Sequence, residues 1–149
     1  MKTWLLRSAW LAGFLLAAVA VLFTVAWFKA EADMARVYQV GDAPLRLAGD
    51  AAERERGAHL YRVGGCGECH GEGGRGKVFI DAGPVARVVA PNLTPAVLGA
   101  RYDTDAIGVA IRHGLDPDGR PLRIMPAGDF TNLSDADTCS ICADASRDR

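Results

Sequence analysis

The sequence lacks features that would assign it to several common classes of protein. It contains no internal repeat and no low-complexity tract, so we do not expect a repeat architecture. It also lacks an excess of positive charge, because 17 Lys and Arg residues are balanced by 18 Asp and Glu, and this argues against nucleic acid as a partner. With 149 residues, the chain has room for one domain of ordinary size plus appendages but hardly for two.

Charge is missing altogether from one stretch, Ser8 to Phe28, which consists mainly of Trp, Leu, Ala, Val and Phe. A membrane-spanning helix needs about 20 such residues. Lys2 and Arg7 precede the stretch, and positive charge before a first spanning helix favours an amino terminus in the cytoplasm. We therefore expect residues 1–30 to anchor the chain in the inner membrane as a single span, with the carboxy-terminal domain in the periplasm.

A cleaved signal peptide is the alternative interpretation of this stretch. Ala26 and the sequence Ala30-Glu31-Ala32 offer small residues of the kind that signal peptidase accepts. The apolar run is long for the core of a signal peptide, which favours the anchor. Both interpretations place the remainder of the chain outside the cytoplasm.

Cysteine is scarce, and two of the four cysteines lie in the motif Cys66-Gly-Glu-Cys69-His70. This spacing is typical of covalent c-type haem attachment. The two thiols add to the haem vinyl groups as thioethers, and the adjacent histidine binds the iron axially. An exported domain suits this chemistry, because bacteria attach such haem outside the cytoplasm. The alternative is a structural cysteine pair, as a disulfide or half of a zinc site, beside an unrelated histidine.

The segments before the motif are predicted from local signals. Residues 31–49 show no sustained periodicity and are interpreted as a tether. Asp50 followed by Glu53 is the pattern of a helix N-cap with its reciprocal capping partner. Gly64 and Gly65 end the helix that follows, so this helix leads directly into the motif.

The segments after the motif contain less regular structure. Residues 71–90 are rich in glycine and are predicted to form a loop with at most a short extended piece. The prolines at the two ends of residues 91–95 exclude a regular helix there. Thr104 is typical of an N-cap for a helix over residues 105–113, which Gly114 ends.

Methionine is also scarce, and Met125 is the only one downstream of the motif. The Asp116–Gly119 sequence is typical of a type I turn that leads toward it. Pro126 disfavours helical geometry at Met125, which suits a side chain that projects its sulfur across a cavity. Met125 is therefore the candidate second axial ligand; the alternative is a flexible core residue. His59 and His113 are more typical of ordinary helix charges than of iron ligands.

The order of these motifs resembles a class I cytochrome c module. The residues that carry the resemblance are Cys66–His70, Pro91-Asn92-Leu93, a short helix, Asp118-Gly119-Arg120 and Met125-Pro126. Further sequences resemble, more narrowly, the modules of cytochrome subunits of membrane-bound bacterial dehydrogenases: Ala90-Pro-Asn-Leu-Thr-Pro95, Ala110-Ile-Arg-His-Gly114 and Leu133-Ser-Asp-Ala-Asp137. The resemblance extends from about Asp50 to Asp137. It implies an all-α fold, the small cytochrome c fold around one covalent haem c, here preceded by a transmembrane helix.

The resemblance also implies a set of site residues. Cys66 and Cys69 would attach the haem, and His70 and Met125 would bind the iron from its two sides. Pro91 matches the proline whose backbone carbonyl accepts a hydrogen bond from the other nitrogen of the axial histidine, which fixes the ring and tunes the iron. Leu93 matches an apolar residue that packs on the haem. The cytochrome c domain would then comprise residues 50–149.

The chain departs from the family pattern from about residue 138. The family would continue with a helix that carries leucines and an aromatic residue, which packs on the face of the first helix formed by Gly57 and Tyr61. Here only a thin apolar stripe is expected, and an altered reading frame would explain such an ending. Cys139 and Cys142 form a second Cys-x-x-Cys without a histidine, so they are expected to form a local disulfide or a free pair. A four-thiol zinc site with the first pair is disfavoured by the long separation.

Together these features predict a membrane-tethered periplasmic electron carrier rather than an enzyme. Filling both axial positions of the iron leaves no open site for a substrate. Its partners would be redox donor and acceptor proteins in the periplasm or membrane. Two alternatives remain open: an electron-transfer subunit of a membrane-bound dehydrogenase or oxidase complex, and a haem-based sensor of small ligands in which the Met125 loop is loose.

Overall fold

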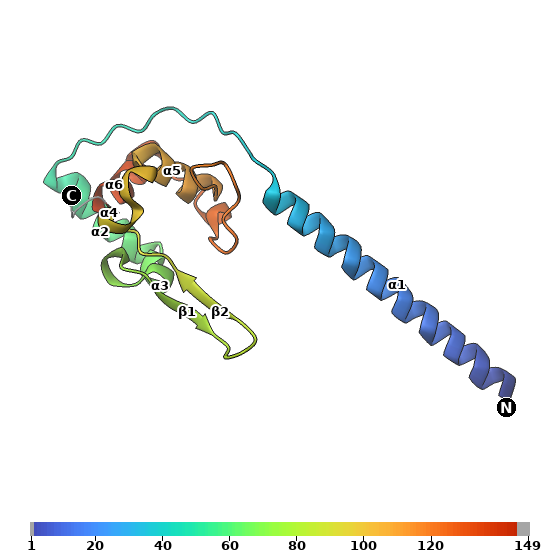
Figure 1. The fold of residues 1–149 in the computed structure, drawn as a ribbon. Helices are drawn as coiled ribbons and strands as arrows, with labels where there is room; N and C mark the ends of the chain where they lie inside the picture. Colours follow the sequence, from blue (N-terminus) through green and yellow to red (C-terminus); the bar gives the residue numbers. More distant parts are fainter. Residues whose placement is uncertain (1, 146–149) are drawn as a thin grey trace. The chain divides into compact units, whose positions relative to one another are not determined.

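A computed structural model of the protein describes residues 2–145, which divide into two units between Val37 and Tyr38 (Figure 1). The first unit is formed by helix α1 (Lys2–Ala35). Over Leu6–Ala35 this helix is long and apolar enough to cross a membrane, and a signal sequence would meet the same criteria. The helix continues past Phe28, so the first part of the predicted tether is helical.

The second unit is mainly helical, which confirms the predicted fold class. Its elements are α2 (Ala51–Val63), α3 (Cys66–His70), β1 (Lys77–Asp81), β2 (Arg87–Ala90), α4 (Pro95–Leu98), α5 (Thr104–His113) and α6 (Asp135–Ala145). Short 3₁₀ helices lie between them at Glu72–Gly74, Gly99–Arg101 and Ala127–Asp129.

Helix α2 begins and ends where its sequence predicts. The Asp50 carboxylate accepts a hydrogen bond of 2.7 Å from the backbone N–H of Glu53. The Glu53 carboxylate reaches back to the N–H of Gly49, one residue before the cap, also at 2.7 Å. Both bonds satisfy donors at the helix start. The helix ends at Gly64, which is its C-cap.

Helix α5 begins one residue earlier than predicted. Asp103, not Thr104, is the N-cap, because its carboxylate accepts a hydrogen bond of 2.8 Å from the Ala106 N–H. Asp is the stronger of these two capping residues, so the helix extends to include Thr104. At the other end Gly114 adopts a left-handed conformation with φ of +65°, as the sequence predicts for a helix stop.

Helix α6 is more deeply buried than the thin apolar stripe predicted for it. Residues 138–143 are all buried, and Thr138 is fully inaccessible to solvent. The helix packs against α2 and α5, and the backbone of Arg46 lies against the Cys139 thiol. Because its side chains are small and it is covered from several sides, polar and apolar positions alike are enclosed. Gly57 of α2 is also buried, in keeping with close helix contact.

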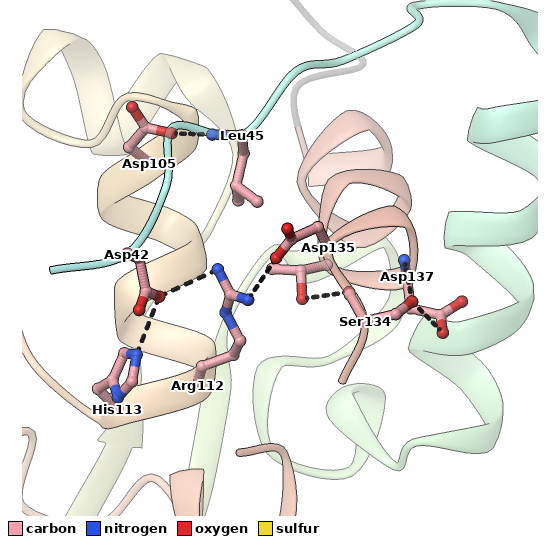
Figure 2. Close-up of polar contacts among 9 residues, drawn as sticks. Asp42, Leu45, Asp105, Arg112, His113, Ser134, Asp135 and Asp137 are labelled. Atoms are coloured by element: carbon pink, nitrogen blue, oxygen red, sulfur yellow. Dashed lines mark hydrogen bonds and ion pairs between the residues drawn. The ribbon is translucent and has the colours of Figure 1, made fainter. Parts of the chain in front are cut away.

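The predicted tether is not free over its whole length. We call residues 38–45 the strap: they belong to the second unit and are hydrogen-bonded to the rest of it, and Figure 2 shows Asp42 and Leu45 beside α5. The Tyr38 N–H donates to the Gly119 carbonyl at 2.8 Å, and the Leu45 N–H donates to the Asp105 carboxylate at 2.7 Å. The sequence did not reveal this contact, since the bonded residues are far apart along the chain.

The glycine-rich segment after the motif contains a β-hairpin, where the sequence predicts a loop with at most a short extended piece. Strands β1 and β2 pair antiparallel, with Lys77 opposite Ala90 and an irregularity between Val78 and Ile80. The β-branched residues of both strands favour this structure. Figure 1 shows the hairpin extending away from α2, α5 and α6. Its last residue, Ala90, is buried and leads directly into Pro91.

Candidate functional site

The two thiols and the imidazole of the motif lie on the short helix α3. Residues three and four apart share a helix face, so the side chains of Cys66, Cys69 and His70 are presented together. All three residues are partly buried. Glycines in positive-φ conformations bound the helix, with φ of +73° at Gly65 and +75° at Gly71.

The His70 ring is held by the backbone carbonyl of Pro91. The distance from Nδ1 to the carbonyl oxygen is 3.0 Å. A carbonyl oxygen can only accept a hydrogen bond, so Nδ1 must carry the proton in this arrangement. The other ring nitrogen, Nε2, then keeps its lone pair available for a metal. The contact expected from the family resemblance is therefore present between these two residues.

A loop between α3 and β1 brings Pro91 and Leu93 to the motif. The Leu93 N–H donates to the Gly74 carbonyl at 2.6 Å, and the Gly76 N–H donates to the His70 carbonyl at 2.7 Å. A Cβ on Gly74 would lie 3.4 Å from the Leu93 Cβ, so these backbones approach closely. The sequence predicts a glycine-rich loop here, and the number of glycines is the one signal in it of such a close approach.

Met125 lies in a segment that is anchored on both sides. Before it, the Leu122 N–H donates to the carbonyl of Gly114, at the end of α5, at 2.6 Å. After it, the Phe130 ring lies near Gly64 and Cys66. A Cβ built on Gly64 would be 3.8 Å from the Phe130 ring and 3.8 Å from the Cys66 Sγ. The Met125 segment therefore runs between the end of α5 and the start of α3. Met125 itself is partly buried, and its role as a ligand stays a prediction.

The cysteines divide into two pairs that do not form a common site. All four thiols are free, and the described residues contain no group of three or more His, Cys, Asp or Glu side chains that could hold a metal ion. The four-thiol zinc alternative is therefore unsupported, and so is a disulfide between Cys139 and Cys142. Burial raises the pKa of the Cys142 thiol to about 12 and also raises the pKa values of Cys139 and Cys66. All three are thus neutral thiols at physiological pH.

The donor set on α3 fits a covalently attached haem. Two thiols and one imidazole share a face, and the imidazole nitrogen that must face the metal is the one not used by Pro91. A family model described as Cytochrome c matches residues 54–143, which extend from α2 to α6. No curated protein matches the chain.

Proposed function

Since the chain belongs to the cytochrome c family, whose members carry covalently bound haem c and transfer electrons, we propose that it is a membrane-tethered periplasmic electron carrier with one haem. In this proposal Cys66 and Cys69 form the thioether bonds, while His70 and Met125 bind the iron. Leu93 lies against the ring. The iron changes between its ferrous and ferric states, and the protein makes and breaks no bond of a substrate.

The hydrogen bond between His70 Nδ1 and the Pro91 carbonyl is the single observation that supports this proposal most strongly. It fixes the tautomer that leaves Nε2 as the metal-binding nitrogen. It also restrains rotation of the ring, which a ligand of a fixed iron requires.

The membrane part of the proposal is supported by α1, whose apolar span has Lys2 and Arg7 at its amino-terminal end. This charge pattern favours a cytoplasmic amino terminus. The haem domain would then lie in the periplasm, where its donor and acceptor proteins are also expected.

The ligand assignment is tested by optical spectra of the haem-loaded protein and of two methionine variants. We expect a low-spin wild type, because two strong axial ligands are bound. Met125→Ala should become high-spin and bind carbon monoxide. Met34→Ala, which removes a methionine from α1, is the matched control and should leave the spectrum unchanged. A high-spin wild type, or a Met125→Ala spectrum like that of the wild type, would contradict the assignment.

A second candidate function is an electron-transfer subunit of a membrane-bound dehydrogenase or oxidase complex. The β1–β2 hairpin favours it, since Val85 is 86% exposed and Val89 60% exposed. A cluster of exposed apolar side chains is typical of a surface that a permanent partner covers. Purification after gentle detergent extraction separates the two candidates: a stoichiometric partner supports the subunit, and a protein that purifies alone supports the free carrier.

The sensor alternative is less well supported than either. It requires a loose loop around Met125, whereas the Leu122 hydrogen bond to Gly114 holds the segment before Met125 and the 3₁₀ helix Ala127–Asp129 after it packs against α5. Binding of carbon monoxide by the unaltered protein would reverse this ranking.

A further inference from the structure

We propose that Gly76 is a positioning residue that sets the place of the Pro91 carbonyl, and through it the strength of the His70 hydrogen bond and the reduction potential of the iron. This inference rests on the proposed role of His70 as an axial ligand. It concerns a backbone contact rather than a group that touches the haem.

Backbone atoms of residues 90–92 fill the space around Gly76. A Cβ on this residue would lie 2.8 Å from the Asn92 backbone nitrogen, 2.9 Å from the Ala90 carbonyl oxygen and 3.0 Å from the Pro91 carbonyl carbon. Real Cβ atoms essentially never come within 3.0 Å of such atoms. All three neighbours are backbone atoms, so none of them can move aside by a change of rotamer. Only glycine permits residues 90–92 to lie where they do.

Gly76 also contacts the other partner of the hydrogen bond. Its N–H donates to the His70 carbonyl at 2.7 Å. The residue is therefore hydrogen-bonded to the donor residue, and the space where its side chain would be is filled by the backbone around the acceptor residue. Its φ of +78° is in the left-handed region, which glycine adopts without strain.

The hairpin makes this contact rigid. Strand β1 begins at Lys77, directly after Gly76, and Lys77 pairs with Ala90, directly before Pro91. Gly76 and Pro91 are therefore each directly next to a residue of the paired strands. A displacement at Gly76 is passed to Pro91 rather than absorbed by a flexible connection.

The direction of the effect follows from the chemistry of imidazole. A hydrogen bond from Nδ1 to a carbonyl makes the ring a more basic ligand, which favours ferric iron over ferrous iron. Moving the carbonyl away weakens the bond and favours ferrous iron, so the potential should rise. We expect up to about a tenfold change in the equilibrium between the two states, which is about 59 mV for a one-electron couple.

The test compares Gly76→Ala with Gly73→Ala in the full haem-loaded chain. Gly73 is the matched control because it also has a positive φ, +60°, but a Cβ there would have nothing within 4 Å. Both variants introduce backbone strain, and only Gly76→Ala introduces a clash. The readouts are the reduction potential and, by NMR, the rate at which the His70 Nδ1 proton exchanges with solvent.

We expect Gly76→Ala to raise the potential and to speed this exchange, while Gly73→Ala leaves both close to the wild type. Equal effects of the two variants, or an unchanged potential in Gly76→Ala, would overturn the inference. If Gly76→Ala does not mature, Gly71→Ala is the second variant. Its Cβ would lie 3.3 Å from the Gly76 carbonyl oxygen and should displace Gly76 by a smaller distance. Its potential should rise by less but in the same direction, and a potential equal to that of Gly73→Ala would again overturn the inference.

Failure of this inference is distinguishable from failure of the proposed function. A wild type without covalent haem refutes the function itself. A wild type with covalent haem and a low-spin spectrum, together with unaffected glycine variants, refutes only the role of Gly76.

Discussion

Replacing Asp42 by alanine should release the strap and destabilise the second unit by about 2 kcal/mol. One oxygen of the Asp42 carboxylate lies 3.0 Å from Arg112 Nη2 and 2.9 Å from His113 Nε2 (Figure 2). Arg112 also bonds to Asp135 of α6 at 2.7 Å. The carboxylate thus joins the strap to α5, and Arg112 joins both of them to α6.

The magnitude follows from how far these groups are sheltered from water. The Arg112 side chain is only 12% exposed and that of Asp42 27% exposed. Hydrogen bonds to charged groups contribute about 1.5 to 3 kcal/mol, and fully exposed ion pairs less than about 1 kcal/mol, so we place the loss near 2 kcal/mol. That change alters the ratio of folded to unfolded protein by about 30-fold. The Arg112 Nε is already buried without a partner among the described residues, so removal of Asp42 would add to the unsatisfied polar atoms of this side chain.

The assay is denaturant unfolding followed by haem absorption and far-ultraviolet circular dichroism. Tryptophan fluorescence is unsuitable, because Trp4, Trp10 and Trp27 all lie in α1. Asp118→Ala is the matched control: it removes a carboxylate that pairs with Arg101 where both side chains are about 60% exposed, and it should cost less than about 1 kcal/mol.

Amide hydrogen exchange locates the effect. The N–H groups of Tyr38 and Leu45 should be protected in the wild type, because both donate to partners in the second unit. They should lose this protection in Asp42→Ala. A cost no larger than that of Asp118→Ala, or a wild type in which both amides exchange freely, would refute the description of residues 38–45 as a docked strap.

Three further predictions follow from burial and charge. With a pKa of about 12, Cys142 should be alkylated at pH 8 roughly a thousandfold more slowly than an ordinary thiol until the protein unfolds; mass spectrometry that finds rapid labelling of the folded protein would contradict this. The Arg56 hydrogen bond, with a smaller contribution from Ser134, lowers the pKa of Asp137, so its stabilising effect should be complete above about pH 4 and be lost as the pH falls through the folded-state pKa. Asp137→Asn should therefore differ from the wild type in unfolding experiments near neutral pH and converge with it in strong acid; a constant difference would contradict the pairing. Ile141→Ala should destabilise the domain by about 2 to 5 kcal/mol, because Ile141 is buried in α6, and a cost under about 0.5 kcal/mol would show that α6 is not part of the core.

Local signals allowed α2 and α5 to be predicted from the sequence. The start of α2 is set by Asp50 and Glu53, and the ends of α2 and α5 are set by Gly64 and Gly114. These contacts involve residues close in the sequence, and the structure contains all of them. The start of α5 was wrong by one residue because two adjacent residues can each act as a cap. The covered state of α6 was missed because its small side chains carry no strong apolar pattern.

Contacts between distant residues could not be predicted in this way. The strap depends on Asp42 meeting His113, and the hairpin on the pairing of Lys77 with Ala90. Neither pairing leaves a periodic signal in the sequence.

The site shows the same division between local and distant information. The spacing of Cys66, Cys69 and His70 is local and predicts haem attachment, whereas the short helix that presents the three side chains together was seen only in the structure. The Pro91 contact was expected only because the order of motifs resembles a known family. The role of Gly76 depends on backbone distances that no pattern of residues encodes.

The central claim is that Cys66 and Cys69 bind one haem covalently, and intact mass spectrometry of the exported protein tests it most directly. We predict a mass equal to that of the polypeptide plus one haem, and after proteolysis the added mass should be on the peptide that contains residues 66–70. A protein with the mass of the polypeptide alone, or with haem attached at Cys139 and Cys142, would contradict it.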